Sequence, residues 1–396
     1  MRFSLALMLY GTIQTSVPLH AALAQQTPSD CTAPQNVSAN LRLDRNCRYA
    51  GPILIDTSNV TLDCDGATID ATRSRNGITI EGRGIRNVAV KSCKIDGAKR
   101  EGIFIKPPLI APDMAALPKA QRYDIAPQNV SIIDSTVTNS GSAGIYVGNY
   151  SQSTLIRNTL VANSGGTAIY LDASSVRTTV ENSTFNGNGF GDPLGRSKGK
   201  LNREAIAIDS SAYNTILNNT FSGNSAGGVF LYKNCWERHD SPKQAQRWQH
   251  SSFNTINGNR FTEKVGVWIA SRQAKNLTNW NCGDPPLAPG YFRDYADHNT
   301  VVSNVFTGGD FGVIIQDDFT TLKENRFFNQ TQSCVVLGSE LRDSLLGAPI
   351  EGTILAKNSC VGLRGGNGFR PEGKSVFRVC SENFLDNQPF NCGGIR

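Results

Sequence analysis

Short runs in which apolar and polar residues alternate recur along most of the chain. One run has Gly or Ala, then an aliphatic residue, then any residue, then a second aliphatic residue. Its copies occupy residues 77–80, 102–105, 144–147, 168–171, 205–208, 228–231, 266–269, 312–315 and, with Cys in first place, 334–337. Alternation over four residues rich in Val and Ile predicts a β-strand with one buried face.

A second phrase precedes most copies of the first. Its clearest copies are NTILNNTF (214–221), NTINGNRF (254–261), NTVVSNVF (299–306) and TTLKENRF (320–327), and weaker copies begin at residues 59, 87, 129, 153 and 178. Its alternation and its Val, Ile and Thr content predict that this phrase is also a strand. Turns rich in Asn, Gly and Ser separate the strands, and no segment has a sustained helical period.

The repeat itself indicates how the strands are arranged. Its shortest unit is a little over twenty residues long. A unit of that size cannot bury its apolar face alone, so neighbouring units must stack. We therefore expect successive coils of short parallel strands. Asn219, Asn259, Asn304 and Asn325 recur two places before a Phe, and in stacked coils they would form a hydrogen-bonded ladder at a spacing of ~4.8 Å.

With these two phrases in constant order, the chain resembles the right-handed parallel β-helix proteins of the pectate-lyase-like superfamily. The resemblance implies an all-β fold, a single-stranded right-handed parallel β-helix solenoid with long loop insertions on one side. The expected β-helix domain covers residues 51–365, with an N-terminal cap at 25–50 and a C-terminal cap or tail at 366–396. The superfamily includes polysaccharide lyases, uronate epimerases, glycoside hydrolases and binding proteins, so it leaves the function open.

The first residues predict export. Arg2, an apolar run and Ala22-Leu23-Ala24 are typical of a secretory signal peptide over residues 1–24, with an uncleaved anchor as the alternative. The signal peptide predicts export, and no later segment has the length and apolarity of a membrane span. We therefore expect a secreted or periplasmic protein.

The cysteines support the same expectation. All ten follow the signal, and an even number in an exported chain favours disulfides. The simplest pairing joins neighbours: Cys31–Cys47, Cys64–Cys93, Cys235–Cys282, Cys334–Cys360 and Cys380–Cys392.

The charge balance is modestly positive, with 39 Lys and Arg, Arg2 among them, against 33 Asp and Glu. This excess suits an acidic polysaccharide or oligosaccharide as partner, and ordinary surface charge explains it equally well. It is too weak and too scattered to indicate nucleic acid. By resemblance to other β-helix enzymes, we expect a monomer without a membrane partner once the signal is removed.

The alternating phrase also defines an outward column of side chains. Its aliphatic residues point inward, so the residue between them points outward. Five members of that column are aromatic: Phe104, Tyr146, Tyr170, Phe230 and Trp268. An exposed aromatic stripe is typical of a surface on which sugar rings stack, and we predict that these residues bind substrate. The alternative is that loops fold back and bury them.

The next outward column carries charge. Asp172 and Asp209 lie on consecutive coils, and Tyr232 follows on the next. Two carboxylates that close raise one pKa, bind a cation or perform acid–base work. As a metal site they would take Ca²⁺, whose oxygen ligands suit carboxylates and which related lyases often use.

Long irregular segments on a rigid scaffold usually carry function, and four interrupt the repeat at residues 107–128, 186–204, 233–252 and 271–298. All four Trp residues lie between 236 and 280. The predicted catalytic residues near the last two insertions are Tyr232, Lys233, Arg238, His239 and Arg272, with Trp236 and Asp317 as further substrate-binding residues. Each has an alternative structural interpretation, such as an Arg272–Asp317 ion pair.

The leading functional hypothesis is a lyase or C5-epimerase that removes a proton α to a uronate carboxylate. This reaction requires a cation at the carboxylate, a base and an acid. Arg272 or Lys233 would supply the cation, and Tyr232 or His239 the base and acid. A glycoside hydrolase using Asp172 with Asp209, or Asp209 with Asp317, is the second hypothesis. A non-catalytic carbohydrate-binding protein is the third.

Overall fold

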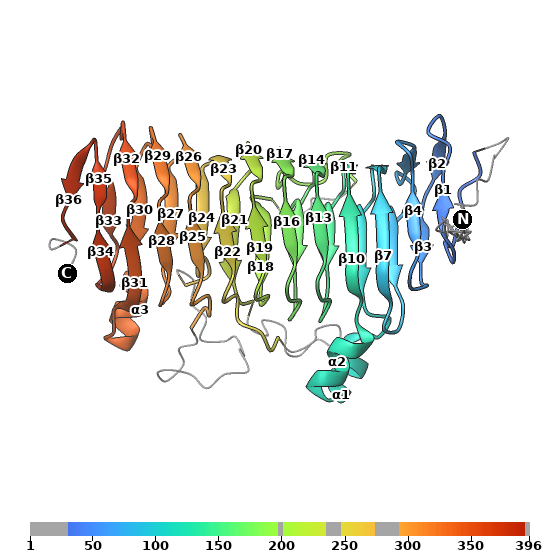
Figure 1. Cartoon of the computed structure of the whole chain (residues 1–396), viewed down its shortest axis with the longest axis horizontal. Coiled ribbons are helices and arrows are strands. Elements are labelled where there is room, and N and C mark those ends of the chain that lie inside the picture. The colour runs from blue at the N-terminus through green and yellow to red at the C-terminus, as the bar shows by residue number, and fades with distance from the viewer. Residues whose placement is uncertain (1–30, 197–200, 235–246, 274–292, 393–396) are drawn as a thin grey trace, which may run out of the picture.

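The computed structural model describes residues 31–196, 201–234, 247–273 and 293–392. Within these residues the chain winds into an elongated solenoid whose first and last coils lie at opposite ends (Figure 1). Each complete coil gives one strand to each of three sheets, and the strands of neighbouring coils pair in parallel. The all-β solenoid and its parallel strands are confirmed.

Sheets 1, 2 and 3 are named in the order in which the chain enters them. Sheet 1 contains β1 (Leu41–Arg42), β4 (Thr61–Asp63), β7 (Arg86–Lys91), β10 (Gln128–Ile133), β13 (Leu155–Arg157), β16 (Thr179–Glu181), β19 (Thr215–Leu217), β22 (Thr255–Asn257), β25 (Thr300–Val302), β28 (Thr321–Lys323), β31 (Ile350–Ala356) and β34 (Ser375–Ser381).

Sheet 2 contains β2 (Arg48–Ala50), β5 (Thr68–Asp70), β8 (Lys94–Asp96), β11 (Thr136–Thr138), β14 (Leu160–Ala162), β17 (Thr184–Asn186), β20 (Thr220–Ser222), β23 (Arg260–Thr262), β26 (Val305–Thr307), β29 (Arg326–Phe328), β32 (Ser359–Val361), β35 (Asn383–Leu385) and β36 (Gln388–Phe390). The pair β35–β36 is antiparallel.

Sheet 3 contains β3 (Ile53–Ile55), β6 (Ile78–Glu81), β9 (Ile103–Lys106), β12 (Ile145–Val147), β15 (Ile169–Leu171), β18 (Glu204–Asp209), β21 (Gly227–Tyr232), β24 (Val265–Ile269), β27 (Phe311–Ile315), β30 (Ser333–Leu337) and β33 (Phe369–Pro371). These strands contain the alternating phrase of the sequence.

The other phrase, predicted as one strand, forms two. In the copy at 214–221, β19 belongs to sheet 1 and β20 to sheet 2, and Asn218 and Asn219 form the bend between them. Asn218 has a φ of 55°, a left-handed conformation that Asn adopts more readily than most residues. The single-strand prediction was wrong because apolar alternation continues through this short bend.

The predicted asparagine ladder fills that corner. The Nδ2 of Asn219 donates to the Oδ1 of Asn259 at 3.0 Å, and Asn259 donates to Asn304 in the same way. The ladder continues through Asn325, Asn358 and Asn383. These side chains are buried and also donate to main-chain carbonyls, so they satisfy polar groups at a corner where strand pairing is interrupted.

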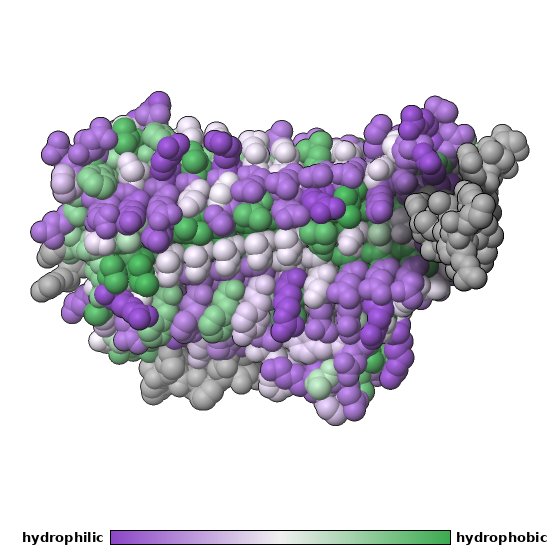
Figure 2. Space-filling view, viewed as in Figure 1, coloured by the Kyte–Doolittle hydropathy of each residue, from purple (hydrophilic) through white to green (hydrophobic). Residues whose placement is uncertain are grey.

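Apolar columns occupy the interior beside the ladder. Phe221, Phe261, Phe306 and Phe327 stack on successive coils with ring centroids 4.6–4.8 Å apart. Similar residues also line up on the surface, where rows of like hydropathy run parallel to the long axis (Figure 2). A side chain within the stacked strands is thus flanked by its counterparts on the neighbouring coils.

Four of the expected disulfides are present: Cys31–Cys47, Cys64–Cys93, Cys334–Cys360 and Cys380–Cys392. Cys235 and Cys282 lie outside the described residues, as do residues 1–24. Disulfides persist in oxidising compartments, which supports an extracellular or periplasmic protein. Among the described residues, no helix has the length and apolarity needed to cross a bilayer.

The segments outside the regular coils differ in character. The insertion at 107–128 contains two short helices, α1 (Ala111–Ala116) and α2 (Lys119–Ile125), which alternation in the sequence did not indicate. A third helix, α3 (Glu340–Leu346), lies beyond the same edge of the solenoid (Figure 1). Strands β1 and β2, and β33 to β36, continue the sheets into the segments expected as caps.

The ladder makes a testable contribution to stability. Asn259→Ala removes donors to Ile216 O and Asn304 Oδ1 and the acceptor of two Asn219 groups. Because buried groups left without partners cost about 1–3 kcal/mol each, we expect the free energy of unfolding to fall by about 2–5 kcal/mol. Denaturant unfolding measures this, and the half-buried Asn257→Ala should change it by less than about 0.5 kcal/mol. Equal losses in both variants would contradict a special role of the ladder.

Candidate functional site

The aromatic residues predicted to face outward share one column on the outer surface of sheet 3. Strand register aligns Phe104 with Tyr146 and Tyr146 with Tyr170, and aligns Phe230 with Trp268 further along. The rings of Tyr146 and Tyr170 stack with centroids 5.3 Å apart. All five are half-buried except Phe230, which is 7% exposed. Four of the rings are therefore partly exposed, and Phe230 is buried.

Three hollows follow one another along this column. The first hollow, ≈ 250 Å³, is lined by Phe104, Lys106, Tyr146, Asp172 and Arg247, among others. The central hollow, ≈ 280 Å³, shares the last three and adds Arg100, Glu101, Tyr170, Arg203 and Asn234. The third hollow, ≈ 660 Å³, shares Arg203 and Asn234 and adds Phe230, Tyr232, Trp268 and Arg272. Because adjoining hollows share side chains, we call the three together the groove.

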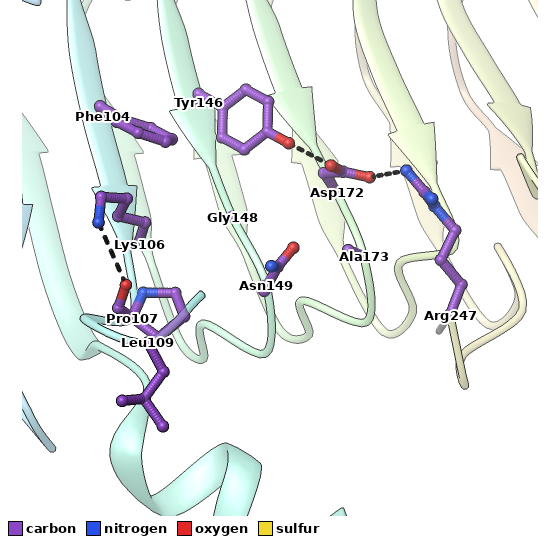
Figure 3. A pocket seen from close by; sticks show the side chains of 10 residues that line it. All are labelled: Phe104, Lys106, Pro107, Leu109, Tyr146, Gly148, Asn149, Asp172, Ala173 and Arg247. Atoms are coloured by element: carbon purple, nitrogen blue, oxygen red, sulfur yellow. Dashed lines mark hydrogen bonds and ion pairs between the residues drawn. The ribbon is translucent and has the colours of Figure 1, made fainter. Parts of the chain in front are cut away.

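Asp172 lies between the first and central hollows, at the turn after β15. The hydroxyl of Tyr146, one coil earlier, donates to its Oδ2. On its other side the Nη2 of Arg247 donates to Oδ1 at 2.8 Å. Figure 3 shows the three side chains in line, with Arg247 reaching the carboxylate from outside the sheet.

Asp209, one coil further, is fully buried and lines none of the hollows. Its Oδ2 accepts from the Tyr170 hydroxyl and from the Asn234 Nδ2, both at 2.6 Å. Its Oδ1 accepts from the Asn234 main-chain N–H at 2.8 Å and lies 3.5 Å from the Arg247 Nε. The two carboxylates predicted to be neighbours thus share one guanidinium. Asp209 holds the groove residues Tyr170 and Asn234 in place from behind, whereas Asp172 itself lines the groove.

Burial sets the proton affinities of this cluster. Burial raises the pKa of Asp172, and Asp209 adds to the rise, while Arg247 opposes it. Burial and the adjacent carboxylates together raise the pKa of Tyr146 and Tyr170 well above the ordinary value for tyrosine. Both hydroxyls therefore hold their protons at neutral pH, and Asp172 is a stronger base than an ordinary aspartate.

The carboxylates do not fit a calcium ion in this arrangement. Calcium takes 6–8 oxygen ligands, but hydrogen-bond donors already occupy the oxygens of Asp172 and Asp209, and Arg247 brings a positive charge between them. In the described parts of the chain, no group of three or more His, Cys, Asp or Glu is placed to hold a metal. The calcium expectation receives no support here.

Tyr232 and Arg272 come together in the third hollow. The Arg272 guanidinium lies 4.7 Å from the centre of the Tyr232 ring. The Tyr232 hydroxyl donates to Glu204 Oε1 and accepts from Arg203 Nη2, both at 2.8 Å. Burial raises the pKa of Tyr232 well above its ordinary value, although Arg203 opposes the shift. The Tyr232 hydroxyl thus keeps its proton and is fixed by two hydrogen bonds, and the Arg272 guanidinium lies against the ring.

Lys233 and Asp317 are buried and do not line the groove. Lys233 is 1% exposed, and its ammonium lies 5.5 Å from the centre of the Tyr295 ring. Asp317 is fully buried with Arg293 and Arg342. Its pairing with Arg293 replaces the alternative Arg272–Asp317 pair that we considered from the sequence. Trp236, Arg238 and His239 lie outside the described residues.

Asp294 ties two groove-side segments together. Its Oδ1 accepts from the Lys233 main-chain N–H and its Oδ2 from that of Arg272, each at 2.7 Å. Burial raises the pKa of this carboxyl to about 7, against the effect of those two hydrogen bonds. One buried side chain therefore fixes where the chain leaves β21 and β24.

Sequence reasoning missed several groove residues, among them Arg100, Glu101, Arg203, Asn234 and Arg247. Four of these five precede or follow a sheet 3 strand, just outside the alternating phrase that defined the outward columns. Arg247 lies within a predicted insertion, where it had no periodic position to mark it.

A family model described as a right-handed beta helix region matches residues 125–282. Together with the three parallel sheets, this match decides the fold. The chain is a right-handed β-helix protein. A comparison with curated protein sequences gives no match.

Two solved structures resemble this β-helix protein over most of its length. The A-module of a mannuronan C-5 epimerase from Azotobacter vinelandii aligns with 89% of this chain and 88% of its own, at 14% identity and a TM-score of 0.52. A periplasmic alginate epimerase aligns with 88% of this chain and 75% of its own, at 12% identity and a TM-score of 0.53. At these identities the likeness establishes the shared fold.

Because Asp172 and Asp209 of the β-helix protein share the Arg247 guanidinium, we predict that the loss of stability on removing it depends on pH. Arg247→Ala leaves two buried carboxylates without their common counter-charge, which should cost about 3–5 kcal/mol of unfolding free energy at pH 8. A carboxyl whose pKa is raised binds its proton more tightly in the folded state, so stability rises as pH falls. The loss should therefore be smaller at pH 5, where Asp172 takes up a proton more readily.

Thermal and denaturant unfolding at both pH values measure this loss. The exposed Arg260→Ala on sheet 2 is the matched control and should change the unfolding free energy by less than about 0.5 kcal/mol at either pH. A loss for Arg247→Ala that is equal at pH 5 and pH 8 would contradict the electrostatic account.

Proposed function

We propose that the protein is an exported enzyme that binds an acidic polysaccharide along the groove and removes the proton α to a uronate carboxylate, as a lyase or C5-epimerase. The observation that carries the proposal is the Tyr146–Asp172–Arg247 arrangement, a protonated hydroxyl beside a buried carboxylate of raised pKa at the surface of an elongated groove.

The groove suits a chain-like ligand. It crosses successive coils from Phe104 to Trp268 and therefore runs along the solenoid, with ring faces and edges in its floor. Cations line all three hollows: Lys106 in the first, Arg100 in the central one and Arg272 in the third. Such a surface favours a sugar polymer that carries carboxylates. Two structures of the same fold are named as epimerases of mannuronan and alginate, which supports this substrate class.

The roles follow from charge and protonation. Arg100, whose side chain is 54% exposed and lines the central hollow, would neutralise the uronate carboxylate and so make the adjacent C–H more acidic. Asp172 is the candidate base because burial raises its pKa. Tyr146 is the candidate acid because its hydroxyl stays protonated. Because Tyr146 and Asp172 are hydrogen-bonded to each other, both would meet the sugar from one side, and Tyr146 would protonate the leaving oxygen in a lyase. An epimerase would need a further group to protonate the opposite ring face.

A single set of incubations separates the reaction types. The mature protein is mixed with polymannuronate, polygalacturonate, glucuronan and glycosaminoglycans in D₂O. A rise in ultraviolet absorbance from unsaturated uronate ends identifies a lyase. Deuterium at C5 without that rise identifies an epimerase. New reducing ends without either signal identify a hydrolase, and binding without any of the three signals identifies a non-catalytic carbohydrate-binding protein.

Two substitutions test the assigned residues. Tyr146→Phe and Asp172→Asn should each lower kcat by about 10²–10⁴-fold, since each removes one proton-transfer group. Affinity for a short oligosaccharide should change by less than about threefold. Tyr49→Phe is the matched control, because it removes a tyrosine hydroxyl from β2 of sheet 2, outside the groove, and should leave kcat unchanged. Turnover that survives in both groove variants would exclude these assignments.

Glycoside hydrolysis is the second candidate, and one observation favours it. Glu101 and Asp172 line the same central hollow, and burial raises the pKa of both carboxyl groups. Two carboxyl groups facing one sugar are what hydrolysis requires. This pair replaces the Asp172/Asp209 pair expected from the sequence, since Asp209 lies behind the groove. Glu101→Gln should abolish release of reducing ends if this candidate holds.

A further inference from the structure

Four rings stack along an outer corner of the solenoid, away from the groove. Tyr213, Phe253, His298 and Phe319 lie two residues before the sheet 1 strands β19, β22, β25 and β28. Their ring centroids are 5.2, 5.0 and 4.7 Å apart in that order. We call these four residues the corner column.

The corner column is exposed. Tyr213 is 50% exposed, Phe253 48% and Phe319 40%, and the nearby Trp248 is 39% exposed. These are four of the six exposed Phe, Tyr and Trp side chains in the part of the chain that the structure describes. Aromatic surface gathered in one place on a protein usually marks an interaction site.

The backbone at this corner is unfavourable for such residues. All four column residues have φ between 53° and 60°, a left-handed conformation that bulky side chains rarely adopt. In the first coils the same register position carries Asn59, Asn87 and Asn129, whose amides hydrogen-bond to one another. The fold therefore forms this corner with asparagine, and the later coils carry exposed rings at a conformational cost.

A hollow lies beside the column. It has a volume of ≈ 230 Å³ and is lined by Tyr213, Phe253 and His298 together with Trp248, Gln249, His250 and Asp297. The Trp248 main-chain N–H donates to the Ser174 Oγ at 2.8 Å, which fixes the tryptophan against the turn after β15. Rings combined with amide, imidazole and carboxylate groups suit a ligand with both apolar faces and hydroxyls.

Cations lie beside two of these rings, Trp248 and Tyr213. Lys119 and Arg122 lie 5.8 and 5.6 Å from the Trp248 ring centre, and Arg177 lies 6.0 Å from that of Tyr213. Asp297, the carboxylate of the hollow, accepts from the Ser252 hydroxyl and lies 3.7 Å from Arg293. The exposed Lys119 and Arg177 therefore offer positive charge to an anionic ligand.

We propose that the corner column and Trp248 form a second binding surface for an acidic polysaccharide chain, separate from the groove. Sugar rings would pack against Trp248 and the column, and Lys119 and Arg177 would meet the carboxylates. The column runs along the solenoid axis as the groove does, so both surfaces can engage one polymer. The choice of a uronate polymer rests on the proposed function, but binding at this surface requires no turnover.

Affinity electrophoresis in gels that contain sodium alginate, polygalacturonate or neutral dextran tests the proposal. Wild-type protein should be retarded by an acidic polymer and not by dextran. Trp248→Ala should weaken that retardation by about tenfold in apparent affinity. Phe384→Ala removes a ring of equal exposure, 39%, from the last coil, and should leave retardation unchanged.

A second variant distinguishes binding from structure. Phe253→Asn restores the residue type found at this corner in the first coils, and asparagine tolerates the left-handed conformation. We expect Tm to stay within about 2 °C of wild type while retardation weakens several-fold. A lower Tm with unchanged retardation would overturn the proposal, because the column would then serve only stability.

Further outcomes separate this proposal from the proposed function. Tyr146→Phe should lose turnover and keep retardation. If wild type turns over no uronate polymer but is retarded by an acidic one through Trp248, the second surface stands and the proposed function fails. The proposal is overturned if no acidic polymer retards wild type. It is also overturned if Trp248→Ala converts a dimer into a monomer in sedimentation, since a second copy would then cover the surface.

Discussion

In-register stacking of parallel coils is the constraint on which the rest of this structure depends. Main-chain pairing at ~4.8 Å places each strand residue beside its counterpart on the next coil. Each side chain must therefore pack against, or hydrogen-bond to, the equivalent side chains of the neighbouring coils. Asn219, Asn259 and Asn304 serve the inner corner because an amide both donates and accepts along a column. Phe261 and Phe306 fill the core because flat rings stack at that spacing.

The same constraint shapes the candidate site. Asp172 and Asp209 are neighbours because their coils are neighbours, and two buried carboxylates at that spacing need a cation. The protein supplies one guanidinium for both, from Arg247, and adds a tyrosine hydroxyl for each. Burial then keeps the protons on the tyrosines and raises the pKa of Asp172. The chemistry of the groove is a consequence of how a stack of coils accommodates adjacent charges.

The sequence predicts what repeats and fails where repetition stops. The sheet 3 strands, the asparagine ladder and the outward positions of Tyr146 and Asp172 all have a counterpart one coil away, so a pattern in the sequence locates them. The bend at Asn218 was not predicted because the apolar alternation of the sequence continues through it. Arg247 was not predicted as a site residue for a different reason. It lies in an insertion, and the 75 residues that separate it from Asp172 correspond to no repeat of the sequence. Lys233 and Asp317 were placed near the correct edge, but their burial depends on loop packing that no local pattern encodes.

The long separation between Arg247 and its partners has a consequence for the order in which the chain matures. A polypeptide emerges from its N-terminus, and a solenoid can add coils as they appear. The coils that carry Asp172 and Asp209 are complete before Arg247 has emerged, so their carboxylates must first rest against one another without a counter-ion. Asp172 and Asp209 thus receive their shared counter-charge from a later part of the chain, and a chain truncated before Arg247 would contain both carboxylates without it.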